Sequence, residues 1–187
     1  MTKMLRFAAR QGMLAALLVG GLSACADTSD EGTAGGFEPV TAADLQTATL
    51  TFATFGDRAL TLVDGRWDDP AGTGEWLELV PDWSGVGDFD ADETMETAGV
   101  ARIFHLDYGE VYLAYSVEAT ANGPVVQADR PLGLDIEIES FEVADNQLVI
   151  VSREPRGANP RAERIYRILN GRWELASHRS LREANAS

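Results

Sequence analysis

Four acidic residues in one short segment carry the oxygen ligands that hard metal cations prefer. In GDFDADETMETAG, three aspartates alternate and a glutamate follows four positions later, at Asp88, Asp90, Asp92 and Glu96. A calcium loop collects such side chains on a tight turn, and a backbone carbonyl and a further carboxylate complete the coordination. The spacing therefore predicts a calcium site, and a solvated acidic turn before a strand is the alternative.

The pattern differs from an EF-hand, because Gly99 stands where the closing glutamate would be and no flanking helices are predicted. A shorter loop of the form D-x-D-x-D-G-x-x-D, found between β-strands, fits better. In that loop the three aspartates occupy positions 1, 3 and 5, Thr94 offers its backbone carbonyl at position 7, and Glu96 stands at position 9.

Glu93 occupies position 6 of this loop, where glycine is usual. A glutamate forced to positive φ costs on the order of 1 kcal/mol, whereas a relaxed backbone would spread the ligands apart. Both outcomes predict a weakened site. Without a cation, the clustered carboxylates are expected to repel one another and to raise their own pKa values.

The beginning of the chain resembles a bacterial lipoprotein signal. Three basic residues precede the apolar stretch Gln11–Gly21, and the following L-S-A-C resembles a lipobox that ends at Cys25. The apolar stretch is shorter than the ~20 residues that cross a bilayer as a helix. Residues 1–24 are therefore predicted to be a signal peptide, and the Cys25 thiol is predicted to carry a diacylglyceryl group.

Lipid on Cys25 makes the membrane the first expected partner, because two or more acyl chains anchor a protein stably. The protein is thus predicted to be exported and lipid-anchored. Ala26 follows the cysteine instead of aspartate, which by resemblance to known sorting signals favours the outer membrane in a Gram-negative host.

The charge balance limits the other partners. Residues 1–24 hold three of the 15 basic residues and none of the 30 acidic ones, so residues 25–187 carry a net charge of −18. Such a charge repels phosphate backbones and disfavours nucleic acid. The sequence identifies no protein or small-molecule partner.

Few other residues suggest catalysis. Cys25 is the only cysteine, and neither a G-x-S-x-G motif nor a zinc-type Cys/His cluster is present. The two histidines, His105 and His178, are predicted to be structural or surface residues. These observations favour a non-enzymatic binding or envelope-associated module. A carboxylate-based hydrolase, supported by calcium and with an acidic cleft near the loop, is the alternative.

The mature chain is predicted to be a single β-domain on a tether. Residues 25–38 are rich in glycine, threonine and acid and should form a flexible tether, residues 39–183 the domain, and residues 184–187 a loose tail. No run of 12 or more residues in the domain shows a helical period. The fold class is therefore all-β and mainly antiparallel, either a sandwich or a partly open barrel, with one solvated face on each sheet.

Alternation and turn residues place the strands. A helical turn capped by Thr41 should precede them in Val40–Leu45. Asp-Gly and Asn-Gly pairs predict two tight hairpins, each of which buries a tryptophan, Trp67 or Trp173. The expected strands are Thr47–Phe55, Ala59–Val63, one starting at Arg66, Glu75–Val80, Thr97–Leu106, Tyr108–Ala119, Val125–Ala128, Leu134–Val143, Gln147–Ser152, Glu163–Leu169 and Arg172–His178, with breaks at Pro81–Gly87 and Asn122–Pro124.

Tryptophans and arginines offer two further surfaces. Core packing is the common role of strand tryptophans. Only Trp83 is expected to be exposed among the four tryptophans, which are Trp67, Trp76, Trp83 and Trp173. A sugar or peptide groove lined by tryptophans is the alternative.

An arginine-rich segment is expected to pair with the domain's own carboxylates, and binding of an anionic partner is the alternative. The segment contains Arg153, Arg156, Arg161, Arg164 and Arg167.

Several short motifs occur in order along the domain: Asp44-Leu45-x-x-Ala48-Thr49, Leu60-Thr61-Leu62-x-Asp64-Gly65-Arg66-Trp67, Gly87-Asp88-Phe89-Asp90-x-Asp92, Tyr112-Leu113-Ala114 and Ile136-x-Ile138-Glu139-Ser140. Together they resemble a group of small bacterial lipoproteins and exported proteins of unknown function, over most of residues 44–175. The resemblance implies a single β-domain in which an intact D-x-(N/D)-x-D-G loop enters a buried Ala/Val strand. It implies no catalytic residues, and Glu93 departs from the intact loop.

Overall fold

The computed structural model describes residues 37–134, 136–154 and 161–181. The predicted signal peptide, Cys25, Arg156 and the tail lie outside these ranges, as does most of the predicted tether. No described helix is long and apolar enough to cross a membrane. The elements are α1 (Ala42–Leu45), β1 (Thr49–Phe52), the 3₁₀ turn η1 (Ala53–Phe55), β2 (Arg58–Thr61), β3 (Arg66–Asp68), β4 (Trp76–Gly87), β5 (Glu96–His105), β6 (Gly109–Thr120), β7 (Gly123–Leu134), β8 (Glu137–Ala144), β9 (Gln147–Arg153), β10 (Arg161–Leu169) and β11 (Arg172–Ser180).

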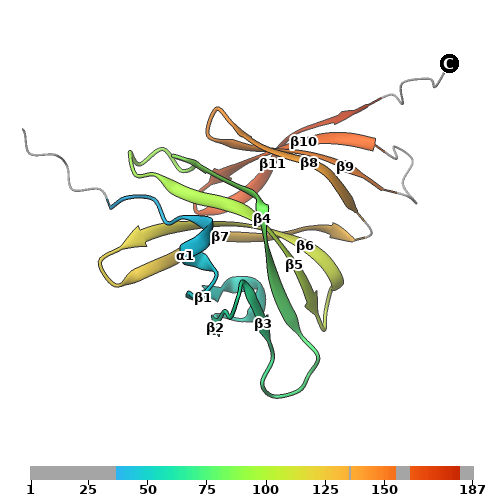
Figure 1. The fold of residues 1–187 in the computed structure, drawn as a ribbon. Helices are drawn as coiled ribbons and strands as arrows, with labels where there is room; N and C mark the ends of the chain where they lie inside the picture. Colours follow the sequence, from blue (N-terminus) through green and yellow to red (C-terminus); the bar gives the residue numbers. More distant parts are fainter. Residues whose placement is uncertain (1–36, 135, 155–160, 182–187) are drawn as a thin grey trace, which may run out of the picture. The chain divides into compact units, whose positions relative to one another are not determined.

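The described strands form three antiparallel sheets (Figure 1), which confirms the all-β prediction. β1 and β2 form a short ribbon. Five strands form a curled, half-barrel sheet in the order β3-β4-β5-β6-β7, and four strands form a second sheet in the order β11-β10-β9-β8.

The five-stranded sheet is buried on both faces. Along β6, Leu113 and Tyr115 belong to a core shared with α1 and the β1–β2 ribbon. Ala114, which points the opposite way, belongs to a core shared with the four-stranded sheet. The expectation of one solvated face is therefore wrong for this sheet, because separate elements cover its two sides.

β4 continues through Pro81–Gly87, where a break was expected. Its pairing with β5 shifts register between Leu79 and Ser84, so Pro81 lies where the ladder is already interrupted. Proline lacks a backbone N–H and is tolerated at such irregular positions. β4 therefore continues past Pro81, although this proline predicted the end of the strand.

β7 is also longer than expected, since it runs from Gly123 to Leu134 and contains two prolines. β7 is an edge strand, and an edge strand tolerates missing N–H groups that would otherwise face solvent. Leu134 ends β7 with 65% of its surface exposed, and β8 begins only at Glu137, so the predicted start of the strand Leu134–Val143 is wrong.

The local turn predictions are confirmed. Thr41 and Asp44 form a capping box at α1, and Asp64-Gly65 and Asn170-Gly171 have positive φ at both positions, as a type I′ turn requires. Asn170-Gly171 joins the paired strands β10 and β11, whereas Asp64-Gly65 closes a single bridge, and β2 and β3 belong to different sheets. The predicted strand Thr47–Phe55 instead ends at Phe52. The carboxylate of Asp129 on β7 accepts hydrogen bonds from the N–H groups of Ala53 and Thr54 and holds η1.

Candidate metal centre

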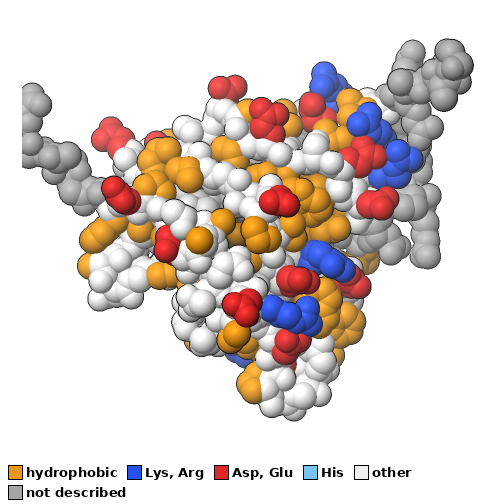
Figure 2. Space-filling model, in the orientation of Figure 1, with side chains coloured by type: hydrophobic (Ala, Val, Ile, Leu, Met, Phe, Trp, Pro, Cys, Tyr) orange, Lys and Arg blue, Asp and Glu red, His pale blue; other side chains and the backbone are white. Residues whose placement is uncertain are grey.

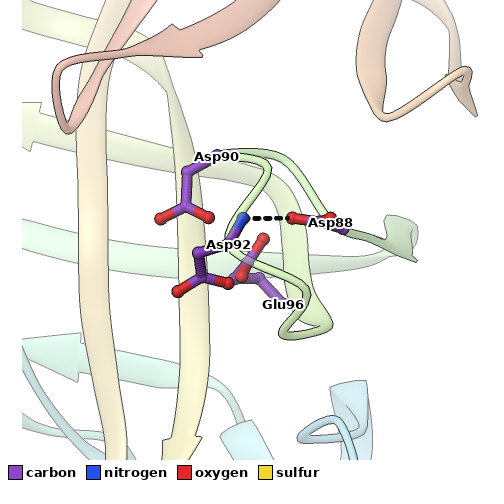
Figure 3. Close-up of side chains that lie close together, drawn as sticks. All are labelled: Asp88, Asp90, Asp92 and Glu96. Carbon is purple, nitrogen blue, oxygen red and sulfur yellow. Dashed lines mark hydrogen bonds between the residues drawn. The ribbon is translucent and has the colours of Figure 1, made fainter.

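The loop between β4 and β5 brings the four predicted side-chain ligands together (Figure 3). Each of Asp88, Asp90, Asp92 and Glu96 contributes a carboxylate oxygen, and these oxygens all lie within 4.8 Å of one another. Glu96 is the first residue of β5 and is only 1% exposed, whereas the aspartates lie on the solvent side. The loop thus forms an acidic cluster with one buried wall, which has the donor chemistry of a metal site.

The backbone keeps the cluster together by adopting left-handed conformations. Ala91 has φ 64° and Glu93 has φ 71°. The Asp92 N–H donates to Asp88 Oδ1 (3.1 Å), and the Thr94 N–H donates to Asp92 Oδ1 (2.8 Å). Glu93 therefore adopts the strained conformation and the ligands stay close, which decides between the two expected outcomes. That Thr94 offers its carbonyl to a cation stays a prediction.

Glu96 is the electrostatically unusual member of the cluster. Burial raises its pKa to about 7, and the charges of Asp90, Asp92 and Asp88 add to the shift. The Phe89 N–H opposes the shift by donating to Glu96 Oε2 (2.7 Å). A buried carboxylate is costly unless an opposite charge compensates it, so a cation here would favour ionised Glu96.

The pKa of Asp90 is also raised, first by burial and then by the charge of Asp92. Like-charge repulsion therefore acts as predicted, but desolvation is the larger cause at both Asp90 and Glu96. A cation in the cluster would oppose both effects, because an opposite charge favours the ionised carboxylates.

Two contacts from the four-stranded sheet position the loop. The Asp88 N–H donates to Asn146 Oδ1 in the β8–β9 turn (3.3 Å). The ring of Phe89 packs edge-on against Trp173 of β11, with ring centroids 5.5 Å apart. Neither contact could be predicted from the sequence, because Asn146 has the character of a turn residue and lies 58 positions from Asp88.

Comparisons with protein-family models, curated proteins and solved structures found no match. The metal-binding interpretation rests on the loop itself, whose residues 88–96 contain no histidine or cysteine. Oxygen donors favour hard cations such as calcium over zinc. The resemblance to small exported proteins stays a prediction.

His105 belongs to a second group of charged residues. Its Nε2 lies 3.4 Å from Glu75 Oε1, and its Nδ1 accepts the Asp107 N–H (3.1 Å), so Nε2 carries the proton of the neutral ring. Burial favours the neutral acid of Glu75, but Arg58 and the Leu106 N–H outweigh it and hold its pKa below the usual range. These contacts give His105 a structural role, as predicted, and His178 is exposed on β11.

The tryptophan and arginine predictions are confirmed in part. Trp67 and Trp173 are buried, as expected. The prediction that only Trp83 is exposed is wrong, because Trp83 is half-buried against Tyr112 and Trp76 is half-buried as well. On the face of the molecule that Figure 2 shows, acidic side chains lie next to the basic side chains. Three arginines of the predicted segment pair with the domain's own carboxylates: Arg153 and Arg161 with Glu139, and Arg164 with Glu154.

Proposed function

We propose that this chain is an exported, lipid-anchored envelope protein whose β-domain is a non-enzymatic binding module supported by calcium. The grouping of four carboxylates, one of them buried, carries the calcium part of the proposal. The L-S-A-C sequence at Cys25 supports the lipid anchor.

Calcium suits the donor set better than magnesium. Calcium takes 6–8 oxygen ligands in a flexible geometry, whereas magnesium needs near-ideal octahedral geometry and keeps several waters. A loop with an irregular backbone, two exposed aspartates and a half-buried one meets the first requirement more easily. With Glu93 strained, the affinity should match that of weak extracellular sites, roughly 10⁻⁴–10⁻³ M.

The cation would have a structural role. The loop belongs to the five-stranded sheet, and through Asn146 and Trp173 it contacts the four-stranded sheet. Neutralising the cluster stabilises the loop and thereby the junction between the two sheets. A module at the cell exterior would in this way be rigid where calcium is available.

Calorimetric titration of calcium into the full chain, purified from membranes in detergent, tests the proposal. Saturable binding is expected, together with a thermal shift; at ten times the dissociation constant the stabilisation is about 1.4 kcal/mol. Asp90→Ala should abolish both signals because it removes a ligand.

Asp82→Ala is the matched control, since Asp82 is an exposed aspartate of β4 outside the cluster. Its calcium binding should equal that of the unmodified chain. Absence of both heat and thermal shift at about 10 mM calcium, beyond the range of weak extracellular sites, would contradict a calcium site.

A further inference from the structure

A concave site lies at the seam between the two larger sheets. It has a volume of about 410 Å³ and is bordered by η1, β7 and the turn between β10 and β11. β7 and β11 contact each other beside it. Small-molecule sites typically have volumes of ~300–1,000 Å³, so a small organic ligand fits this seam hollow.

The seam hollow is lined by arginines that lack a carboxylate partner. Seven of the ten arginines in the described ranges form ion pairs with carboxylates. Of the three described arginines outside these pairs, Arg130 and Arg172 both line the seam hollow, while Arg167 lies elsewhere on β10. In a chain with twice as many acidic as basic residues, the presence of two arginines without an ion-pair partner in one hollow favours an anionic ligand.

The side chains of Asp129 and Gln127 on the wall are already occupied, whereas the buried indole N–H of Trp173, which also lines the seam hollow, has no hydrogen-bond partner among the described residues. Both carboxylate oxygens of Asp129 accept backbone N–H groups of η1, at 3.0 and 2.8 Å. The side-chain amide of Gln127 donates to Glu118. The negative charge of Asp129 offsets one arginine, which leaves a net positive charge on the lining.

The two arginines have donors to spare. Arg130 Nη1 donates to the Trp173 carbonyl (2.8 Å), which holds the guanidinium across the seam between β7 and β11. No other acceptor for Arg130, and none for Arg172, exists among the described residues. A guanidinium presents five N–H donors in a planar fork that matches carboxylate and phosphate oxygens.

We propose that the seam hollow binds a small organic anion through Arg130 and Arg172, which hold its carboxylate or phosphate group. This site is separate from the calcium loop and takes a ligand of opposite charge. It gives the domain a ligand class, which goes beyond the proposed calcium-supported module and does not depend on it.

The test uses the full chain purified from membranes in detergent, in calcium-free buffer of constant ionic strength. Succinate and inorganic phosphate are titrated separately by calorimetry, with sodium chloride as the blank. Saturable binding is expected for at least one of them; binding of succinate assigns a carboxylate ligand, and binding of phosphate alone assigns a phosphate ligand.

Arg172→Gln is the informative variant, because Arg172 is exposed and its side chain makes no hydrogen bond to a described residue, so only its backbone pairs with β10. A lost charge-assisted contact should weaken binding at least about tenfold. Arg167→Gln removes an equally exposed, uncompensated charge away from the seam hollow and should leave binding unchanged. Circular dichroism confirms that both variants fold.

Two results would overturn the proposal. One is the absence of saturable binding of either anion at concentrations up to about 10 mM. That result would mean that any dissociation constant lies above the millimolar range. The other is equal weakening by Arg172→Gln and Arg167→Gln, which would assign the effect to the general surface charge instead of the seam hollow.

Discussion

Glu93 holds the backbone of the acidic loop in a conformation that glycine adopts at lower cost. Its φ of 71° lies in the left-handed region, where a Cβ crowds the following carbonyl. The strain keeps the neighbouring aspartates on one side of the turn, as the hydrogen bond from Asp92 to Asp88 shows. The site therefore keeps its geometry at the expense of stability.

Replacing Glu93 with glycine should raise the free energy of unfolding by about 1 kcal/mol, because the left-handed backbone is no longer strained. Denaturant unfolding in the presence of EDTA measures this. Glu93→Ala removes the same charge but keeps the Cβ, so it should not give the same gain. Equal stabilities of the two variants would assign the effect to charge.

Glu96 makes the stability of the cation-free protein depend on pH. Its pKa is raised from 4.5 to about 7 by burial. A carboxyl group with a raised folded pKa contributes full stability below the unfolded pKa and loses it as pH rises through the folded pKa. The cation-free protein should therefore lose up to about 3 kcal/mol between pH 4.5 and a pH above 7.

Glu96→Gln should remove that pH dependence, because the amide stays neutral at every pH. Without calcium, the variant should be more stable than the parent at pH 8 and similar to it at pH 4.5. Calcium should no longer stabilise it, since a ligand is lost. Unfolding curves at both pH values, with and without calcium, give four free energies of unfolding for each protein. If the stability of the variant changed with pH as much as that of the parent, Glu96 would not be the group responsible.

At the scale of elements, the acidic loop depends on a hairpin from the other sheet. Asp145 and Asn146 have φ values of 49° and 56°, as in a type I′ turn. The Asn146 side chain then reaches the Asp88 N–H at the end of β4. The β8–β9 hairpin thus positions the first residue of the candidate metal site.

Asn146→Gly should weaken calcium binding about fivefold, because the loop loses one hydrogen bond worth about 1 kcal/mol. Glycine suits the positive φ, so the turn itself should persist. Asn170→Gly makes the same change in the β10–β11 turn, at φ 53°, and should leave the calcium affinity unchanged. Calcium titration of both variants distinguishes a specific contact from a general effect of turn glycines.

At the scale of the whole molecule, the described domain has two cores that share one sheet. Small residues of β5, β6 and β7 face the four-stranded sheet, namely Ala98, Ala114 and Ala128, and allow the two sheets to approach closely. The acidic loop and the seam hollow both lie where these sheets meet. Ligands at either place would act on the packing between the sheets.

The proposed lipid anchor at Cys25 predicts where the molecule is found in the cell. Cys25→Ser should move the protein from the membrane fraction to the soluble exported fraction, because serine has no thiol to receive the diacylglyceryl group. Mass spectrometry of the N-terminal peptide should show the lipid only in the parent. Retention of the variant in the membrane fraction would contradict anchoring through Cys25.

Features made by neighbouring residues could be predicted from the sequence. The type I′ turns at Asp64-Gly65 and Asn170-Gly171, the capping box at Thr41 and the grouping of the acidic loop depend on residues a few positions apart. Their free energies come from backbone sterics and short hydrogen bonds, which the local sequence specifies. The all-β class follows from side-chain alternation, which is equally local.

The remaining features required tertiary structure, because they depend on contacts between distant segments. Asn146 meets Asp88 across 58 positions, and β4 continues past Pro81 only because its pairing with β5 is irregular there. Burial of both faces of the five-stranded sheet requires separate elements to pack against it, and Arg130 and Arg172 line one hollow only because β7 and β11 come together. Alternation tells which residues share a face, but not which sheet will cover that face.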